Sequence, residues 1–426
     1  MKAVVMAGGK GTRMASLSTT LPKPMLPLGG KPILAHTVEL LAREDFREIF
    51  LVVGHQKEEI MRYFGGGHAF GVRISYVVED TPLGTAGALS LLKKELSGED
   101  FLLLCGDLLC DVNLKSFYAF HKEKGGVVTL LTHPSNHLFD STAVVRDQNG
   151  KVTALLPPTP ERGDVPNCTN AGLHFCAPAL LDSFGEPKKT DLDREVLSPL
   201  SQKGALFAYQ SPEYVRDVGT PARLAEAAED LAKGRLQKWR LTARKPAVFL
   251  DRDGTVNQHV GFLTHPDQIK LLPHAAEAIR RLNEQGYPVF LVTNQPVLAR
   301  GEVTWEGLDA IHRRLHTLLS REGAYLTDIF VCPHHPDSGF AGEVAALKIP
   351  CDCRKPAPGL LLRAAARYGI DLSRSVMIGD SECDVLAGKN AGCLTAIIGT
   401  HPEADIEGPH LLACVRAFLT REGVET

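Results

Sequence analysis

The sequence has 426 residues, of which 44% are hydrophobic and 23% charged, and its formal net charge at pH 7 is -3. One hydrophobic core usually stops growing at about 250 to 300 residues, so this length predicts two domains. The nearly balanced charge gives no reason to expect nucleic acid or a membrane surface as a partner, and no apolar run reaches the roughly 18 residues that span a bilayer. The composition favours small-molecule partners.

Short apolar segments that end in glycine or polar residues recur along the chain, each followed by an amphipathic stretch. They are KAVVMAGG, EIFLVVGH and FLLLCGDLL in the first half, and AVFLDRDG, VFLVTNQ and SVMIGDS in the second. This alternation predicts α/β folds with parallel strands and with chemistry at the strand C-terminal ends. We predict doubly wound domains at residues 1–233 and 246–426, joined by a basic linker at 234–245.

The N-terminal segment MKAVVMAGGKGTRM lacks the apolar region and cleavage site of a signal peptide. Of the ten cysteines, three are clustered with histidines and the others are scattered. This distribution favours a metal site in a reducing compartment over a disulfide framework. We therefore expect a cytoplasmic protein.

A glycine-rich loop follows the first apolar segment, and its residues are Gly8, Gly9, Lys10, Gly11, Thr12 and Arg13. Glycines let the backbone approach an anion, while Lys and Arg offset its charge. Ten residues further on, two prolines flank Lys23 and present it rigidly. A plain strand-to-helix turn can also be rich in glycine, but the loop and Lys23 together favour a phosphate site.

The loop and the segment LPKPMLPLGGKPIL resemble the nucleotidyltransferases that make nucleoside-diphosphate sugars. The resemblance extends over roughly residues 1–232 through DTPLGTAGAL, the pair Gly106-Asp107, NAG at 170–172 and VRDVGTP. It implies that a sugar 1-phosphate attacks the α-phosphorus of a nucleoside triphosphate and releases pyrophosphate. Arg13 would hold the triphosphate and Lys23 the reacting phosphates, and Asp107 with Asp217 would hold Mg²⁺. The implied substrate contacts are Gly8, Gly9, Gly11, Thr12, Gly84, Gly87, Asn170 and Gly172.

Two departures from this family pattern concern the transferase site. Cys105 stands where the family commonly has Asn before the Gly-Asp pair, and LLPPTPER replaces the usual EKP triplet that contacts the sugar. The second departure leaves the residues that contact the sugar unassigned.

Two carboxylates, Asp251 and Asp253, end the apolar segment AVFL in the second half. Paired acids at a strand end suit one nucleophile and one general acid, although such a pair can also cap a helix. With VTNQ, CRKP and IGDSECD, this segment resembles the haloacid dehalogenase superfamily of phosphatases. The resemblance implies that Asp251 attacks phosphorus and Asp253 moves the proton.

The same resemblance implies the other members of this site. Mg²⁺ would lie between Asp251, the carbonyl of Asp253 and Asp380, with Asp384 in support. Thr293 and Asn294 would bind the phosphoryl group, and Lys355 would offset its charge.

A second metal site is predicted by the segment CPHHPDSGFAGEVAALKIPCDC. Cys332, His334, Cys351 and Cys353 supply four donors for a closed, structural Zn²⁺ site. His335 is the alternative to His334. Because Cys353 directly precedes Arg354 and Lys355, the metal loop would also fix cationic substrate contacts.

These segments together resemble the D,D-heptose 1,7-bisphosphate phosphatase branch, which is close to histidinol-phosphate phosphatase. In that branch Arg300 and Arg354 would contact the substrate. Pro296 stands where the branch usually has Ser, and Ser381 where it often has Lys.

The two resemblances imply consecutive reactions of GDP-heptose biosynthesis, of the kind that serves lipopolysaccharide or S-layer carbohydrate. The phosphatase product, a heptose 1-phosphate, is the class of acceptor that the transferase activates, with GTP as the expected nucleotide. The alternatives are a mannose 1-phosphate guanylyltransferase fused to a histidinol-phosphatase-like enzyme, or an N-terminal domain that only senses nucleotide sugars. The oligomeric state is open, a homo-oligomer included.

Overall fold

The computed structural model describes residues 1–9, 21–136, 138–147, 149–159, 161–241, 244–339 and 341–424. Its internal contacts divide the chain into two compact units. Unit 1 contains Met1–His133, Thr142–Pro157 and Cys168–Arg240, and unit 2 contains Pro134–Ser141, Pro158–Asn167 and Leu241–Thr426. No helix within the described ranges is long and apolar enough to cross a membrane.

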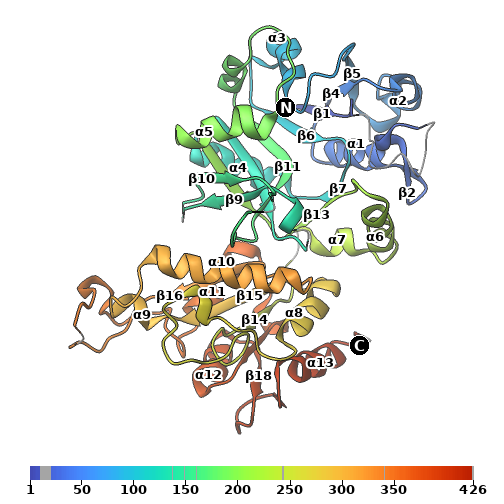
Figure 1. The fold of residues 1–426 in the computed structure, drawn as a ribbon. Coiled ribbons are helices and arrows are strands. Elements are labelled where there is room, and N and C mark those ends of the chain that lie inside the picture. The colour runs from blue at the N-terminus through green and yellow to red at the C-terminus, as the bar shows by residue number, and fades with distance from the viewer. Residues whose placement is uncertain are drawn as a thin grey trace. The chain divides into compact units, whose positions relative to one another are not determined.

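Unit 1 is built on a mixed sheet that has nine strands among its described residues (Figure 1). β1 (Lys2–Met6) lies between β4 (Glu48–Val53) and β6 (Phe101–Cys105) and is parallel to both, whereas β11 (Thr169–Cys176) runs antiparallel to β6. The other strands are β5 (Arg73–Val78), β8 (Val128–His133), β9 (Ala143–Arg146), β10 (Val152–Leu156) and β12 (Leu206–Gln210). Because β4 and β6 flank β1 on opposite sides, the strand order reverses at β1, where such sheets place ligands.

Two short pairs of antiparallel strands complete unit 1. β7 (Leu108–Asp111) pairs with β13 (Tyr214–Asp217), and β2 (Pro27–Leu28) pairs with β3 (Lys31–Pro32). The helices are α1 (Ile33–Arg43), α2 (Lys57–Phe64), α3 (Lys93–Leu96), α4 (Leu114–Lys124), α5 (Ser198–Gln202), α6 (Pro221–Ala232) and α7 (Arg235–Trp239), with 3-10 turns at η2 (Lys23–Met25) and η4 (Gly87–Leu92) and a π-helical turn at η7 (Leu192–Leu197).

Alternate residues of the central strands of unit 1 pack on opposite faces of the sheet. Val5 belongs to a core that includes residues of α1, α2 and α4, whereas Val4 belongs to a core that includes residues of η4 and η7. Burial on both faces explains why these strands are continuous apolar runs.

Part of the expected linker is a helix. The segment from residue 235 to 239 forms α7, and Leu236 is buried in a cluster with Leu109 and Tyr214. Its apolar contact with the β7–β13 pair gives this basic segment a folded position that its charge pattern did not indicate.

Unit 2 has a six-stranded parallel sheet with the order β16-β15-β14-β17-β18-β19. The strands are β14 (Val248–Leu250), β15 (Val289–Asn294), β16 (Asp328–Cys332), β17 (Val376–Gly379), β18 (Leu394–Ile398) and β19 (Ile406–Gly408), and the helices are α8 (Ala275–Glu284), α9 (Pro296–Ala299), α10 (Trp305–Arg321), α11 (Gly359–Tyr368), α12 (Glu382–Ala391) and α13 (Leu411–Arg421). The strand order reverses between β14 and β17. The predicted α/β architecture is thus confirmed for both units.

Helices cover both faces of this sheet (Figure 1). Leu250 packs in a core with α8, α10 and α13, and Phe249 packs in a second core with α11 and α12. Because helices cover both faces, the residues that follow β14 and β17 are accessible to a ligand only at the carboxyl edge of the sheet.

Candidate active sites and metal centre

Lys23 lies between the two carboxylates that the sequence predicts as a metal pair in unit 1. Its ammonium forms an ion pair with Asp107 and lies 3.8 Å from Asp217 Oδ1. Asp107 follows β6 and Asp217 ends β13, whose pairing with β7 places Asp217 opposite Leu108. The Val218 N–H donates to the Asp107 carbonyl at 3.1 Å. Pairing of β7 with β13 therefore brings two acids that are distant in sequence to one cation.

Arg223 is a member of this site that sequence reasoning missed. It lies in the first turn of α6, is buried, and donates from Nη1 to Asp217 Oδ2 at 2.6 Å. Asp217 Oδ1, the other oxygen, faces Lys23. The sequence signal for Arg223 was its position six residues after Asp217, in the first turn of a helix that begins with Pro.

The described part of the glycine-rich loop lies at the carboxyl end of β1. An added Cβ on Gly8 would lie 2.5 Å from Glu79 Oε2, whereas a Cβ on Gly9 would meet none of the described residues within 4 Å. The close contact at Gly8 is with the end of the flexible Glu79 side chain, and Gly9 borders space that the described residues leave open. Gly11, Thr12 and Arg13 lie outside the described residues.

Gly84 and Gly87 pack closely against the backbone of residues 188–190. Gly84 has φ +80°, and added Cβ atoms would lie 2.5 Å from Thr190 O and 2.2 Å from Lys188 O respectively. The predicted binding loop is therefore fastened to the chain segment before η7. Both positions require glycine for packing, whatever ligand they border.

Asn170 and Gly172 lie near the start of β11, where the register with β8 is irregular. Gly172 has φ +75°, and its N–H donates to Asn170 Oδ1 at 3.1 Å. An added Cβ on Gly172 would lie 3.2 Å from Cys105 Sγ. Gly172 therefore lies close to Cys105 at the end of β6, and its hydrogen bond holds Asn170 beside it.

In unit 2, three carboxylates gather around the ends of β14 and β17. One oxygen each from Asp251, Asp380 and Asp384 lies within 4.8 Å of the others. Oxygen ligands of an octahedral Mg²⁺ lie about 3 to 4 Å apart, because each Mg–O distance is about 2.1 Å. This hard-oxygen donor set fits Mg²⁺, and Asp384, predicted as its support, lies within the same cluster.

Lys355 is the cation that holds two of these acids. Its Nζ lies 2.6 Å from Asp251 Oδ1 and 2.6 Å from Asp384 Oδ1, and the side chain is almost fully buried. Burial raises the pKa of Asp251 to about 6; the charge of Lys355 opposes this shift and that of Asp384 adds to it. The ammonium of Lys355 therefore limits the rise in the pKa of the nucleophile candidate.

Two glycines leave the space that the carboxylates occupy. An added Cβ on Gly254, which has φ +86°, would lie 1.9 Å from Asp380 Oδ2. On Gly379 it would lie 2.2 Å from the carboxyl carbon of Asp384.

Asp253 lies in a hydrogen-bond network with the fully buried Arg252. Arg252 Nη2 donates to Asp253 Oδ2 at 2.7 Å, and Asn257 and Gln295 donate to the two oxygens at 2.9 and 3.0 Å. Burial alone would raise the pKa of Asp253, but the Arg252 charge and these hydrogen bonds outweigh it and hold the pKa below its usual value. Arg252 and Gln295 were missed by sequence reasoning, although both adjoin predicted residues.

Thr293 and Asn294, predicted to bind the phosphoryl group, end β15. Asn294 Oδ1 accepts from the Lys355 N–H at 3.0 Å, and Asn294 Nδ2 donates to the Lys355 carbonyl at 3.1 Å. Thr293 is buried, and its Oγ1 accepts from Gln295 Nε2 at 2.9 Å. Asn294 thus positions Lys355, and the phosphoryl contact of both residues stays a prediction.

Of the two predicted substrate arginines, Arg300 stacks on Phe262, with the guanidinium carbon 4.1 Å from the ring centre. Arg354 Nη1 donates to the carbonyl of His334 at 3.2 Å, which ties it to the cysteine loop.

Replacing Lys355 with Met should destabilise unit 2 strongly. The change leaves Asp251 and Asp384 without their shared cation, and loss of one partner of a buried ion pair costs about 3 to 5 kcal/mol of unfolding free energy. Urea unfolding of the full chain in EDTA would measure this loss. Lys389→Met, on the exposed side of α12, is the matched control and should change little; equal stability of the two variants would contradict the assigned role.

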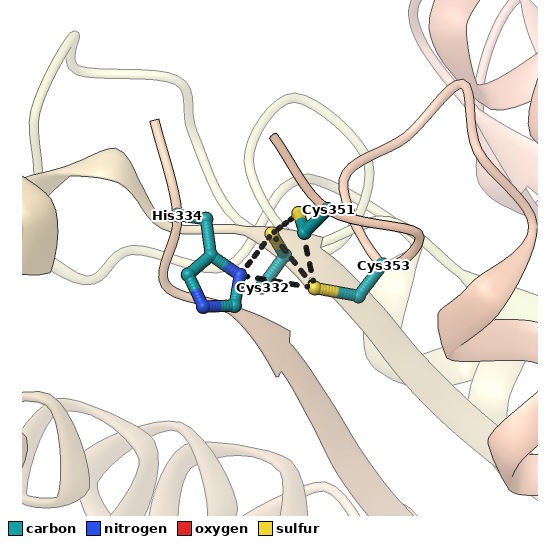
Figure 2. Close-up of side chains that lie close together, drawn as sticks. All are labelled: Cys332, His334, Cys351 and Cys353. Atoms are coloured by element: carbon teal, nitrogen blue, oxygen red, sulfur yellow. Dashed lines mark hydrogen bonds between the residues drawn. The ribbon is translucent and has the colours of Figure 1, made fainter. Parts of the chain in front are cut away.

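The four predicted zinc donors form one cluster (Figure 2). The three sulfur–sulfur distances are 3.2, 3.4 and 3.6 Å, and His334 Nδ1 lies 3.3 Å from Cys353 Sγ and 3.8 Å from Cys332 Sγ. These distances exclude disulfides, whose S–S bond is about 2.05 Å. Tetrahedral Zn–S bonds of about 2.3 Å place sulfurs about 3.8 Å apart, so the donor set fits zinc. His334 supplies the imidazole, and His335 Nδ1 accepts instead from the Asp337 N–H at 3.2 Å.

Comparisons with known proteins agree with this division into two sites. The profile of the family described as "Nucleotidyl transferase" matches residues 2–234. That described as "haloacid dehalogenase-like hydrolase" matches residues 198–392, and so begins within unit 1.

Three relatives illustrate the two halves. A D-glycero-beta-D-manno-heptose-1,7-bisphosphate 7-phosphatase of Rhodopseudomonas palustris is 41% identical over 149 residues, which are 35% of this chain and 81% of that protein. A UTP–glucose-1-phosphate uridylyltransferase of Synechocystis is 32% identical over 220 residues, 49% of this chain and 57% of that protein. A mannose-1-phosphate guanylyltransferase catalytic subunit beta of Dictyostelium discoideum is 32% identical over 227 residues, 52% of this chain and 62% of that protein. The chain thus spans less than two thirds of the length of these transferase relatives.

The chain belongs to the nucleotidyl transferase family through its N-terminal half and to the haloacid dehalogenase-like hydrolases through its C-terminal half. It is therefore an enzyme that joins a nucleotidyltransferase to a phosphatase, as the sequence motifs predicted.

Proposed function

We propose that this enzyme removes the 7-phosphate of D-glycero-D-manno-heptose 1,7-bisphosphate and then transfers a nucleotidyl group, GMP from GTP, to the resulting heptose 1-phosphate. The observation that carries the proposal is the 41% identity of the C-terminal half to a heptose bisphosphate phosphatase, in one chain with a sugar-1-phosphate nucleotidyltransferase fold. The product of the first reaction carries the group that the second requires.

In the phosphatase reaction, Asp251 attacks phosphorus and forms an aspartyl-phosphate while Asp253 protonates the leaving sugar oxygen. Free Asp253 is ionised because of Arg252. The negative charge of an arriving phosphate raises its pKa, so that Asp253 takes up a proton from solvent and delivers it to the leaving oxygen. In the second step Asp253 takes a proton from water, which attacks the phosphoryl group and regenerates Asp251. Lys355 orients Asp251 and offsets charge on the transferring group. Bound Mg²⁺, held by Asp251, Asp380 and the Asp253 carbonyl, would add electrostatic stabilisation, with Asp384 in support.

In the transferase reaction, the sugar phosphate oxygen forms a bond to the α-phosphorus and the bond to pyrophosphate breaks, without a covalent enzyme intermediate. Lys23 neutralises the reacting phosphates. Asp107 and Asp217 would hold Mg²⁺, and Arg223 keeps Asp217 in place through one oxygen. One oxygen of Asp107 and one of Asp217 lie within ion-pair distance of the Lys23 ammonium. Two carboxylate oxygens placed this close together suit the hard cation Mg²⁺.

The test supplies purified full-length enzyme and Mg²⁺ with heptose 1,7-bisphosphate and, in turn, GTP, ATP, CTP or UTP. We expect phosphate and pyrophosphate to be released in equal amounts and GDP-heptose to be identified by mass spectrometry. Formation of a different nucleotide sugar would correct the choice of base. Release of neither product would reject the proposal.

The second candidate is a hexose 1-phosphate nucleotidyltransferase, and the relatives of the N-terminal half favour it because they act on glucose or mannose 1-phosphate by name. In the same assay, mannose 1-phosphate with GTP would then be consumed at a higher kcat/KM than heptose 1-phosphate.

We also propose that the cysteine cluster binds one structural Zn²⁺, because four donors close a tetrahedral site. Replacing Cys353 with Ser should remove the bound zinc and lower the thermal stability of unit 2. Cys393→Ser is the matched control, since Cys393 is a buried cysteine of the same core cluster outside the zinc set. Zinc content by mass spectrometry and thermal unfolding are the measurements, and equal zinc in both variants would contradict the site.

A further inference from the structure

The transferase site contains a carboxylate that no predicted role uses, Asp193 in η7. Its Oδ1 accepts from Asn170 Nδ2 at 3.1 Å, and its Oδ2 accepts from Thr142 Oγ1 at 3.0 Å. Burial raises the pKa of Asp193, and the two hydrogen bonds oppose that shift. The side chain is only partly exposed, so the two donors fix its orientation.

Asp193 is connected to the reacting end of the site through Asn170. The other oxygen of this amide, Asn170 Oδ1, accepts from Gly172, which packs against Cys105. Burial raises the pKa of the Cys105 thiol, and the charges of Asp107, Asp193 and Asp217 add to the shift. Asp193 therefore lies near the same thiol as the two acids proposed to hold Mg²⁺.

The binding loop also leads to Asp193. The Thr85 and Ala86 N–H groups donate to Thr190 O at 3.1 and 3.2 Å, and the Leu192 N–H donates to Thr85 Oγ1 at 2.7 Å. The next residue is Asp193. The loop of Gly84 and Gly87 thus fixes the segment that presents this carboxylate.

We propose that Asp193, oriented by Asn170 and Thr142, accepts a hydrogen bond from a hydroxyl of the sugar 1-phosphate and so determines which sugar is used. This inference rests on the proposed transferase function and deepens it. Each carboxylate oxygen can accept about two hydrogen bonds, and among the described residues Thr142 and Asn170 supply one donor to each, so a hydroxyl finds an acceptor already in place.

The segment LLPPTPER, which stands in place of the family's EKP triplet, leaves the residue that contacts the sugar unassigned. Its Arg162 donates to the carbonyls of Leu138 and Ser141, at 2.5 and 2.7 Å, and so is engaged with the main chain. A carboxylate supplied from η7 would provide the sugar contact from another part of the chain.

The experiment compares Asp193→Asn with Asp191→Asn, which makes the same charge change two residues away. Asp191 caps η7 by accepting from the Arg194 N–H at 2.9 Å, and Asn retains that cap. Pyrophosphate release is measured with heptose 1-phosphate, mannose 1-phosphate and monodeoxy analogues of the latter, and with the nucleoside triphosphate varied separately. Loss of a hydrogen bond to a charged acceptor predicts that Asp193→Asn raises KM for the sugar phosphate about tenfold or more. KM for the nucleotide should change less than about twofold, and Asp191→Asn should resemble wild type.

A hydroxyl contact also predicts that one deoxy analogue abolishes the difference between Asp193→Asn and wild type, because the partner of Asp193 is then missing from both. Unchanged KM for every sugar phosphate would overturn the inference, and so would parallel increases for sugar and nucleotide with a lower unfolding temperature. If wild type uses no sugar 1-phosphate, the proposed function itself fails.

Discussion

Asp251→Asn is expected to lower phosphate release by at least about 10⁴-fold, because the amide cannot form the acyl-phosphate bond and no neighbouring acid can replace it. Asp253 is held by Arg252, Asn257 and Gln295, and Asp384 is paired with Lys355. The variant should fold, since Lys355 keeps one of its two partners. Phosphate release from heptose 1,7-bisphosphate is the measurement.

The internal control is the transferase reaction of the same preparation, which should retain wild-type pyrophosphate release from a sugar 1-phosphate and nucleotide. Phosphate release within tenfold of wild type would show that Asp251 is not the nucleophile. Loss of both activities would indicate misfolding, and circular dichroism would reveal it.

Asp107→Ala should have the opposite effect, lowering pyrophosphate release about 10³-fold while phosphate release continues. The change removes a carboxylate proposed to hold the catalytic metal and also the ion-pair partner of Lys23, so the reacting phosphates lose both metal and orientation. Asp182→Ala, an exposed acid of unit 1, is the control and should leave both activities unchanged.

A mixture of the Asp251→Asn and Asp107→Ala proteins tests whether the two reactions are separable. Each variant retains the activity that the other lacks, so the mixture should form the nucleotide sugar from heptose 1,7-bisphosphate although neither variant does so alone. Failure of the mixture, with both single activities intact, would mean that the intermediate does not leave the chain.

Local sequence patterns were sufficient for the central strands and for the acids at their ends. The segments of β1, β4, β6, β14, β15 and β17 all form parallel strands, because burial on both faces demands continuous apolar runs. Asp251 and Asp380 meet because parallel strands expose their carboxyl ends at the same edge of the sheet. Chain order alone did not reveal the antiparallel strands of unit 1, such as β11 beside β6.

The residues that sequence reasoning missed act through tertiary contacts. Arg252 looks like an ordinary charged residue within its motif, and only the fold buries it against Asp253 and Gln295. Arg223 and Asp193 lie on helical turns. Their hydrogen bonds with Asp217 and Asn170 form only because the fold brings those two residues in from distant strands. No local periodicity encodes such encounters, because they depend on strand pairing elsewhere.

Gly254 and Gly379 set a limit on how unit 2 can vary. A methyl group at either position would collide with Asp380 or Asp384, so even alanine would displace an acid from the cluster. Glycine at these two positions is therefore as necessary to the proposed phosphatase site as the acids themselves. Saturation mutagenesis should therefore find these two positions nearly invariant under selection for phosphatase activity.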